Sequence, residues 1–471
     1  MDSPRLRSSL LAILRCPFCA DSFEFDEKPG PALGRAEFGL LRCKCSTFPV
    51  IDGIPIIQRA PVCMLEHTHG TQETDGIGID ALIVLIEGGD TLDALLECVA
   101  VPEVPKTWRA ALGWRVSHSR FVTRAARARS KKKFVAQVLT SRDVIGARDL
   151  LEHYYLSGGP LNPAMGHYFI RRFGQPRHLA ALAMAATIAS ASRPVLDIAC
   201  GIGNLEHYFC CRSDPAPVVG MDMNFYHLWI ARHWMAPAAN YVCANASDGL
   251  PFADDSFAST ICSDAYHLIR NHAHLLHEVE RCAPGRPVVL TRVGNAAVMP
   301  NEGVERSLEL YLSEFAASAR AFDEDDLVKG YLLRLDAFSP PVQSKEDLGG
   351  SKWLSFAWNV PRTSLRTIAT DTISPHAVGK LGINPIYVRA PGTDGALQLR
   401  FQFPLVWYAY ENHAMLSYHP RLVALSRAQL ENLSTWQGDP SMQKLVDAFV
   451  LLGLPFRFSE DGSRSLVREA K

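Results

Sequence analysis

The stretch VLDIACGIGN, residues 195–204, decides the fold of this chain. Leu196 and Ile198 belong to a short apolar run that is typical of a buried strand. Gly201 and Gly203 then allow the backbone to turn sharply and to approach a ligand closely. The helix that follows directs its first amides and its positive dipole end toward that ligand. The sequence therefore predicts a ligand site at a strand–turn–helix junction.

Two acidic residues indicate which ligand suits this turn. A dinucleotide fingerprint needs a third glycine at the position of Glu206. A carboxylate there would repel a pyrophosphate, and so would Asp197 at the end of the strand. S-adenosylmethionine carries an ammonium and a sulfonium group and no phosphate. The residues of the turn therefore favour S-adenosylmethionine over NAD.

The motif resembles the first motif of class I S-adenosylmethionine-dependent methyltransferases, D-x-G-x-G-x-G. Here it reads DIACGIG, with Ala199 in place of the first glycine. Further matching stretches follow in the family's order: VVGMD (218–222), NYVCANASDGLPFADDSF (240–257), STICSDAYHLIRN (259–271) and HLLHEVERCAPGRPVVLTRVG (274–294). The resemblance is to methyltransferase type 11-like domains. It implies an α/β fold with a doubly wound, mostly parallel sheet of seven strands.

The resemblance also implies a set of residues that hold S-adenosylmethionine. Asp222, at the end of the second strand, is placed to accept hydrogen bonds from the ribose hydroxyls. Asn245 replaces an acid that faces the adenine amino group, and its side-chain carbonyl can still accept that hydrogen bond. The candidate cofactor-binding residues are Asp197, Ala199, Gly201, Gly203, Asp222, Met223, Asn245, Ala246 and Ser263.

Two residues after the fourth predicted strand are candidates for catalysis. Asp264 and His267 follow the carboxyl end of that strand, where this fold places substrate-side residues. His267 is the first candidate for a general base because imidazole titrates near neutral pH. A purely structural histidine is the alternative. The loop has no N-P-P-[YFW] motif, which makes an exocyclic amino group less favoured as the acceptor.

The first 60 residues predict a small metal-binding module. Cys16 and Cys19 form a C-x-x-C knuckle, and Cys43 and Cys45 form a second pair. Two such pairs are typical of a zinc ribbon with four thiolate ligands. LLAILRCPFC (10–19) and FPVIDGIPII (48–57) resemble the zinc-ribbon family that includes the activator of tRNA methyltransferases. The single spacer in the second pair departs from that pattern, so a ribbon without metal is the alternative.

The remaining sequence predicts how the chain is divided. We expect a zinc-ribbon-like module (1–60), a helical connector (61–150), a methyltransferase core (151–300) and a C-terminal α+β elaboration (301–471). The elaboration would supply the last two sheet strands from 383–390 and 397–410, joined by a hairpin turn at 392–395, together with an insertion near the acceptor. Helices are predicted over 78–101, 304–322 and 441–456. Residues 115–134 are strongly basic, which favours either a phosphate contact or a solvated helix face.

Composition narrows the class of protein. The 471 residues carry a net charge of −1, which gives no global attraction to nucleic acid or to an anionic membrane. No apolar run reaches the roughly 18 residues of a membrane span, and the N-terminus lacks the pattern of a signal peptide. We therefore expect a cytoplasmic protein with no membrane span. The 12 cysteines suggest one metal site and buried thiols instead of a disulfide framework.

Together these observations predict a methyltransferase that acts on oxygen or nitrogen of a small-molecule or glycan-type acceptor. The aromatic residues of the C-terminal part, such as Trp353, Phe356 and Trp358, suit the enclosure of a small molecule or sugar. An RNA base methyltransferase is the first alternative, because a ribbon precedes the core and 115–134 is basic. A degenerate scaffold or binding protein is the second, and a protein partner that binds through the ribbon also stays open.

Overall fold

The structure of the protein is a computed structural model. It describes residues 8–30, 37–62, 77–99, 138, 145–156, 163–299, 305–334, 345–360, 374–437 and 439–458. The basic stretch 115–134 lies outside these residues. Among the described helices, none combines the length and the apolar character that crossing a bilayer requires.

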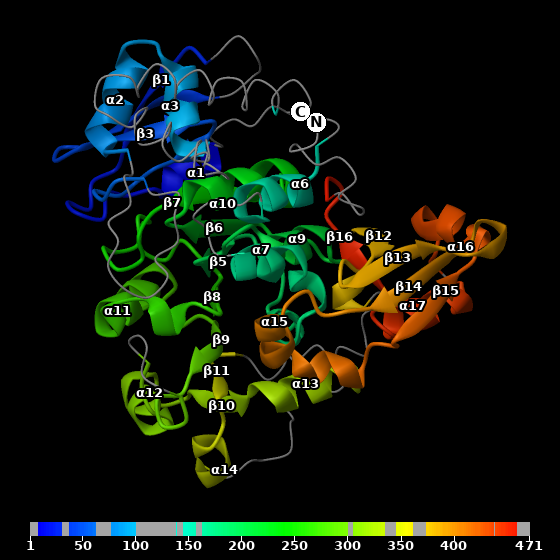
Figure 1. Cartoon of the computed structure of the whole chain (residues 1–471). Coiled ribbons are helices and arrows are strands. Elements are labelled where there is room, and N and C mark those ends of the chain that lie inside the picture. Colours follow the sequence, from blue (N-terminus) through cyan, green and yellow to red (C-terminus); the bar gives the residue numbers. More distant parts are fainter. Residues whose placement is uncertain are drawn as a thin grey trace, which may run out of the picture.

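A seven-stranded sheet forms the centre of the molecule, in the order β10-β11-β9-β8-β5-β6-β7 (Figure 1). The five strands from β9 to β7 run parallel to one another, whereas β11 is antiparallel to both of its neighbours, β9 and β10. The strands are β5 (Val195–Ile198), β6 (Val218–Asp222), β7 (Asn240–Cys243), β8 (Ser259–Ser263), β9 (Val288–Gly294), β10 (Arg320–Asp323) and β11 (Trp353–Trp358). The predicted fold class is confirmed.

Helices cover both faces of this sheet, which explains why its strands are continuous apolar runs. Every residue of β5 is buried. Val195 packs into one core with residues of α8 (Pro176–Ala185) and α10 (Phe225–Ile230). Leu196 and Ile198 pack into the other core with α11 (His272–Cys282). Alternate residues of one strand thus contribute to two cores, as a doubly wound sheet requires.

The prediction of the last two sheet strands is wrong. Residues 383–390 and 397–410 do not join the central sheet, because β10 and β11 occupy those places. The hairpin itself is confirmed: β13 (Tyr387–Pro391) pairs antiparallel with β14 (Leu397–Phe401), and both belong to a separate sheet with β15 (Leu422–Leu425). The two hairpin strands are largely exposed, whereas β11 is buried over nearly its whole length, as a strand inside a covered sheet must be.

Two predicted helices are also shorter than expected. The helix over 441–456 ends early: α17 covers Pro440–Asp447, and β16 (Leu451–Leu454) then pairs with β12 (Lys380–Ile383). Similarly, α12 covers only Leu308–Glu314 of 304–322 before β10 begins. By contrast, the helical reading of 78–101 is confirmed by α2 (Ile79–Glu87) and α3 (Thr91–Val99). The remaining described α-helices are α1 (Ser8–Ile13), α6 (Ala147–Leu151), α7 (Pro163–Ile170), α9 (Asn204–Cys211), α13 (Glu324–Leu332), α14 (Lys345–Gly349), α15 (Val406–Glu411) and α16 (Arg427–Glu431).

The N-terminal module lies against the β7 edge of the central sheet (Figure 1). Its strands β1 (Glu24–Lys28), β2 (Phe38–Arg42), β3 (Thr47–Ile51) and β4 (Ile54–Pro55) form an antiparallel sheet. Just after β4, Ile56 bridges Cys243 in parallel, and the Ile57 amide donates to the Cys243 carbonyl at 2.8 Å. An open sheet edge exposes unpaired backbone groups, so this contact protects the edge.

A buried carboxylate joins the ribbon to the core. Asp52 and Gly53 form the two-residue turn between β3 and β4, with φ of 49° and 72°, as the Asp-Gly pair favours. Asp52 is only 3% exposed. It accepts hydrogen bonds from Trp229 Nε1 at 2.8 Å and His233 Nε2 at 2.7 Å. Burial alone would raise the pKa of Asp52, but the charge and hydrogen bond of His233 outweigh it and lower the pKa.

We expect Asp52→Ala to destabilise the protein strongly, because it removes the buried charge that accepts hydrogen bonds from both Trp229 and His233. The loss should reach about 3–5 kcal/mol of unfolding free energy in denaturant titrations. Since the pKa of Asp52 is lowered on folding, its contribution should be present above the unfolded pKa and disappear as the pH falls. The matched control is Asp21→Ala in the same module, whose partner Lys44 is 85% exposed. It should cost less than about 1 kcal/mol. Equal losses in the two variants would contradict the assignment.

Candidate functional site

The glycine turn after β5 has the geometry that the sequence predicts. Gly201 and Gly203 have φ of 57° and 84°, and Ala199 shares this left-handed conformation with φ of 58°. A Cβ on Gly203 would lie 3.0 Å from the Ala231 Cβ, so a residue with a side chain would be crowded at this position. Asp222 fixes the turn from the next strand, because its Oδ2 accepts from the Gly201 amide at 2.9 Å.

Two carboxyl groups are buried directly around this turn. Asp197 is 2% exposed and Glu206 is fully buried. Within the described residues, Asp197 Oδ1 and both carboxyl oxygens of Glu206 have no hydrogen-bond partner. Burial raises the pKa of Asp197, as does the neighbouring Glu206, and burial raises the pKa of Glu206 to about 8. Because these neighbouring carboxyl groups have raised pKa values, a ligand that brings a cationic donor would favour their ionised form. S-adenosylmethionine is the cofactor that this fold implies, and its ammonium group meets this requirement.

The other predicted cofactor residues follow the same edge of the sheet. Met223 follows β6 and is 41% exposed, which makes it available to a ligand ring. Asn245 Oδ1 accepts from the Ser247 amide at 2.9 Å and keeps a second acceptor position. Ala246 is buried, whereas Ser263 Oγ accepts from Thr291 Oγ1 at 2.9 Å. These residues therefore lie near the carboxyl ends of neighbouring strands, the usual position of ligands in this fold.

Asp264 lies at the centre of a buried ion cluster, one residue beyond β8. Its Oδ2 accepts from Tyr168 Oη at 2.9 Å, from Arg172 Nη1 at 2.9 Å and from Arg177 Nη1 at 3.2 Å. Arg292 Nε lies 3.1 Å from Oδ1. Burial alone would raise the pKa of Asp264, but the three guanidinium groups hold this pKa well below its usual range. Asp264 therefore stays ionised near neutral pH. It is suited to pair with cationic groups and is a poor proton donor or acceptor.

Three further charged residues complete this ion cluster. Glu411, from α15, accepts from Arg292 Nη2 at 2.8 Å and from Lys352 Nζ at 3.1 Å, and lies 3.4 Å from Arg177 Nη2. Glu324 pairs with Arg292 Nη1. We define the ion cluster as Arg172, Arg177, Arg292, Lys352, Asp264, Glu324 and Glu411. Sequence reasoning missed all of its members except Asp264, because isolated Arg and Glu residues carry no motif.

His267 lies beside this cluster. It is 6% exposed, and its Nδ1 has no hydrogen-bond partner in the described part of the chain. Its ring is 5.5 Å from that of Trp353. Burial lowers the pKa of His267, and the nearby Asp264 charge opposes this only in part. The imidazole is therefore neutral at pH 7, which is the form that can accept a proton.

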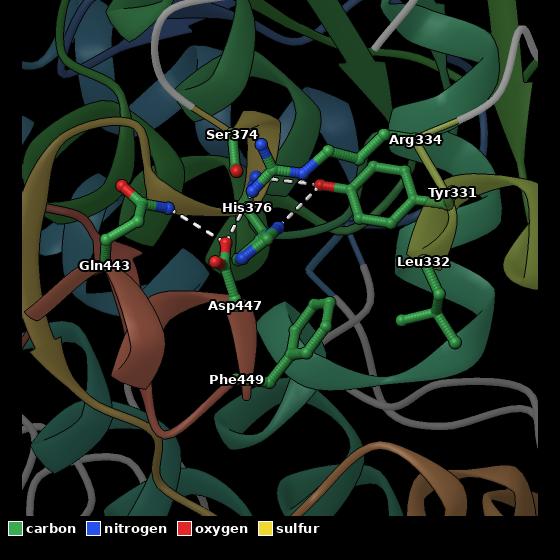
Figure 2. Close-up of a pocket in the computed structure, with 8 residues that line it drawn as sticks. All are labelled: Tyr331, Leu332, Arg334, Ser374, His376, Gln443, Asp447 and Phe449. Atoms are coloured by element: carbon green, nitrogen blue, oxygen red, sulfur yellow. Dashed lines mark hydrogen bonds and ion pairs between the residues drawn. The ribbon is translucent and has the colours of Figure 1, made fainter. Parts of the chain in front are cut away.

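A separate cavity of about 320 Å³ lies in the C-terminal part, lined by residues of α13, α17 and the segment before β12 (Figure 2). His376 donates from Nε2 to the Val446 carbonyl at 3.1 Å and accepts from Tyr331 Oη at Nδ1, 2.8 Å away. Arg334 pairs with Asp447 at the exposed rim. Both ring nitrogens of His376 thus have partners within the protein. None of the predicted site residues lines this cavity.

The four cysteines of the N-terminal module form a compact thiol cluster. The Sγ atoms of Cys16 and Cys45 are 3.6 Å apart, those of Cys19 and Cys43 are 3.8 Å apart, and those of Cys43 and Cys45 are 3.7 Å apart. All four lie within 4.8 Å of one another. A tetrahedral zinc with bonds of about 2.3 Å requires sulfur separations of about 3.8 Å. The set could therefore bind one zinc ion, and the single spacer of the second pair does not prevent it.

We expect the purified full-length chain to hold about one zinc per molecule, measured by inductively coupled plasma mass spectrometry. Cys43→Ser should lower the zinc content well below one, because three thiolates hold zinc more weakly than four. Cys211→Ser is the matched control, since Cys211 is exposed and lies outside the cluster. Wild-type protein that contains no zinc after expression with added zinc would contradict the prediction.

Comparison with known proteins agrees with the fold. A family described as "Methyltransferase domain" matches residues 195–284. No curated protein matches the chain. The similar solved structures include a methyltransferase from a complex with the Haloferax volcanii Trm112 activator (14% identity, 45% of this chain, 98% of that chain, TM-score 0.31). Another is Haemonchus contortus phosphoethanolamine N-methyltransferase 2 with S-adenosylmethionine (18% identity, 46% of this chain, 61% of that chain, TM-score 0.33).

These identities and scores are too low to transfer a substrate or a partner. The matched domain spans β5 to α11 and contains the glycine turn, Asp222 and the Asp264 loop. The seven-stranded, mostly parallel sheet that includes this domain is the one that the sequence resemblance implies. The chain therefore contains a methyltransferase domain with the class I S-adenosylmethionine-dependent methyltransferase fold.

Proposed function

We propose that this protein transfers a methyl group from S-adenosylmethionine to a small-molecule or glycan-type acceptor, on oxygen or nitrogen. The observation that carries the proposal is the position of two chemically different groups of residues at one sheet edge. The glycine turn with Asp197, Glu206 and Asp222 follows β5 and β6, and Asp264 with His267 follows the adjacent β8. A cofactor and an acceptor bound to these groups would be neighbours.

The proposed cofactor pose uses the residues of the turn. Asp197 would take the ammonium group and Asp222 the ribose hydroxyls, while Met223 would cover the adenine and Asn245 would accept from its amino group. When bound, S-adenosylmethionine supplies an activated methyl group. The protein then needs chiefly to orient the acceptor and to exclude water.

His267 is the proposed general base for an acceptor that must lose a proton. Its neutral imidazole and the unused Nδ1 support this role. The aromatic neighbour Trp353 supports an enclosed acceptor. Asp264, held ionised by arginines, is proposed as a positioning residue.

The RNA alternative depends mainly on residues 115–134, which lie outside the described part of the chain. The acidic residues of the ribbon would disfavour phosphate, although Asp21 pairs with Lys44 and Asp26 with Lys28 and Arg42. The alternative of a protein partner that binds through the ribbon is less favoured, because one edge of the ribbon already contacts β7 of the same chain. We therefore keep a small acceptor as the main proposal.

Asp222→Asn should weaken S-adenosylmethionine binding at least about tenfold in isothermal titration calorimetry. The charge that accepts the ribose hydroxyls is lost, and Asn can accept from only one of the two backbone amides, of Gly201 and Asn224, that Asp222 holds. Asp254→Asn is the control, because Asp254 is 80% exposed and pairs only at the surface with Arg281. If the wild type binds no S-adenosylmethionine at millimolar concentration, the protein is a scaffold and the proposed function is wrong.

His267→Gln should lower kcat by about 10²–10⁴-fold and leave the Kd for S-adenosylmethionine within about twofold. In the wild type, kcat should rise with pH to a plateau whose midpoint lies below pH 6.5, since burial lowers the pKa of His267 and the base form is the neutral one. The variant should lose this pH-dependent arm. The assay needs an acceptor, which can be found with labelled S-adenosylmethionine in small-molecule, glycan and RNA extracts. Label found only in RNA, and abolished by Asp222→Asn, would favour the RNA alternative.

A further inference from the structure

The ion cluster contains more positive than negative groups at the place where an acceptor would bind. Its four cations are Arg172, Arg177, Arg292 and Lys352, and its three carboxylates are Asp264, Glu324 and Glu411. The register of the sheet brings it close to the cofactor turn. Ile198 pairs with Cys262, and Ser263 pairs with Thr291, so Asp264 and Arg292 lie two residues beyond the end of β5 in the register of the sheet.

The backbone at this edge is held in a costly conformation. Ala199, Asp264 and Arg292, on three neighbouring strands, have φ of 58°, 61° and 52°. Each such residue costs about 1–2 kcal/mol relative to ordinary backbone. The conformation directs Arg292 toward Asp264, Glu411 and the ring of Trp353, which is 4.0 Å from its guanidinium carbon.

Glu411 comes from a different part of the chain than the other two carboxylates of the cluster. Asp264 belongs to the loop after β8, and Glu324 begins α13, which packs against α8. Glu411 is the last residue of the short helix α15, which reaches the cluster from the C-terminal part of the chain. Asp264 contacts the three arginines, whereas Glu411 contacts Arg177, Arg292 and also Lys352, the most exposed cation of the cluster. The Glu411 carboxylate is therefore the group that a competing anion would replace.

The helix that carries Glu411 presents several apolar side chains to solvent. Val406, Trp407 and Tyr410 are 90%, 44% and 74% exposed, whereas the Glu411 side chain is 12% exposed. Tyr408 is fully buried and fixes the helix to the C-terminal core. Besides Glu411, α15 is tied to the cofactor domain through Tyr408, whose hydroxyl accepts from Gln175 Nε2 at 3.1 Å.

We propose that Glu411 occupies the subsite for an oxyanion of the acceptor, a carboxylate or a phosphate, which displaces it and binds Arg177, Arg292 and Lys352. The inference rests on the proposed function and deepens it, because it makes the acceptor an anionic small molecule. Lys352 is the accessible member of this subsite, at 36% exposed. Its Nζ lies 5.5 Å from the Trp353 ring and 5.1 Å from the Tyr410 ring, so an apolar part of the acceptor would lie against these two rings.

The test measures oxyanion binding by the full-length protein without any methyl transfer. Inorganic phosphate and succinate are titrated by calorimetry against the wild type and Glu411→Gln at constant ionic strength, with chloride as the reference. Removing the internal carboxylate should tighten binding of at least one probe about tenfold or more, and the preferred probe identifies phosphate or carboxylate. Adding Lys352→Met to Glu411→Gln should reverse most of the gain. Glu431→Gln is the matched control, since Glu431 pairs with Arg427 at the surface, and it should change nothing.

Glu411→Asp provides a second variant if Glu411→Gln unfolds. It keeps the charge but shortens its reach, so oxyanion binding should be intermediate. Folded Glu411→Gln or Glu411→Asp that binds both probes no better than the wild type would overturn the proposal. So would a gain that survives Lys352→Met unchanged. S-adenosylmethionine titrations on the same samples separate the two claims, because Glu411→Gln should keep the wild-type cofactor Kd. If no sample binds the cofactor, the proposed function fails whatever the oxyanion result.

Discussion

The charge of Asp264 is the constraint on which the arrangement of this molecule depends. One carboxylate, 9% exposed, receives guanidinium groups from three separate segments: Arg172 before α8, Arg177 in α8 and Arg292 in β9. Three buried guanidinium groups without it would be uncompensated charges, and breaking a buried ion pair typically costs about 3–5 kcal/mol. Two of these arginines, Arg177 and Arg292, also bind Glu411 and so connect the C-terminal part to the sheet.

This arrangement divides the ligand edge of the sheet into two chemically different halves. The side of β5 and β6 carries the carboxyl groups of Asp197, Glu206 and Asp222, whose pKa values are raised by burial, whereas the side of β8 and β9 carries the arginines. A cationic cofactor would favour the ionised form of these carboxyl groups, and in our proposal the arginines bind an anionic acceptor.

The ribbon has a different physical role from the ion cluster. It pairs backbone to backbone next to β7 and places Asp52 among Trp229 and His233 of the helical layer. The edge of the sheet is thus covered and a buried carboxylate is neutralised by the same contact. The two cysteine pairs of this module lie together in the thiol cluster, away from Asp52.

The features that could be predicted from the sequence are those that depend on neighbours along the chain. Short local sequence patterns define several features of this protein. They are the apolar run of β5, the glycine turn, the Asp-Gly turn of the ribbon and the two cysteine pairs. For that reason the five parallel strands of the sheet, the glycine turn and the thiol cluster were predicted correctly. Hairpin β13–β14 was likewise correct as a hairpin, because alternation and turn residues define a strand pair locally.

Tertiary structure alone decided which elements pair and which charges are buried. The apolar run of β11 and the alternation of β14 differ locally, but neither pattern indicates which strand pairs with β9, because packing on both faces selects the partner strand. Nor could the sequence indicate that Arg177 meets Glu411, since 234 residues separate them. Arg and Glu are usually solvated, and only the fold removes water from them. The proposed acceptor side of the site is built from such distant charges, whereas the glycine turn proposed to hold the cofactor is a contiguous motif.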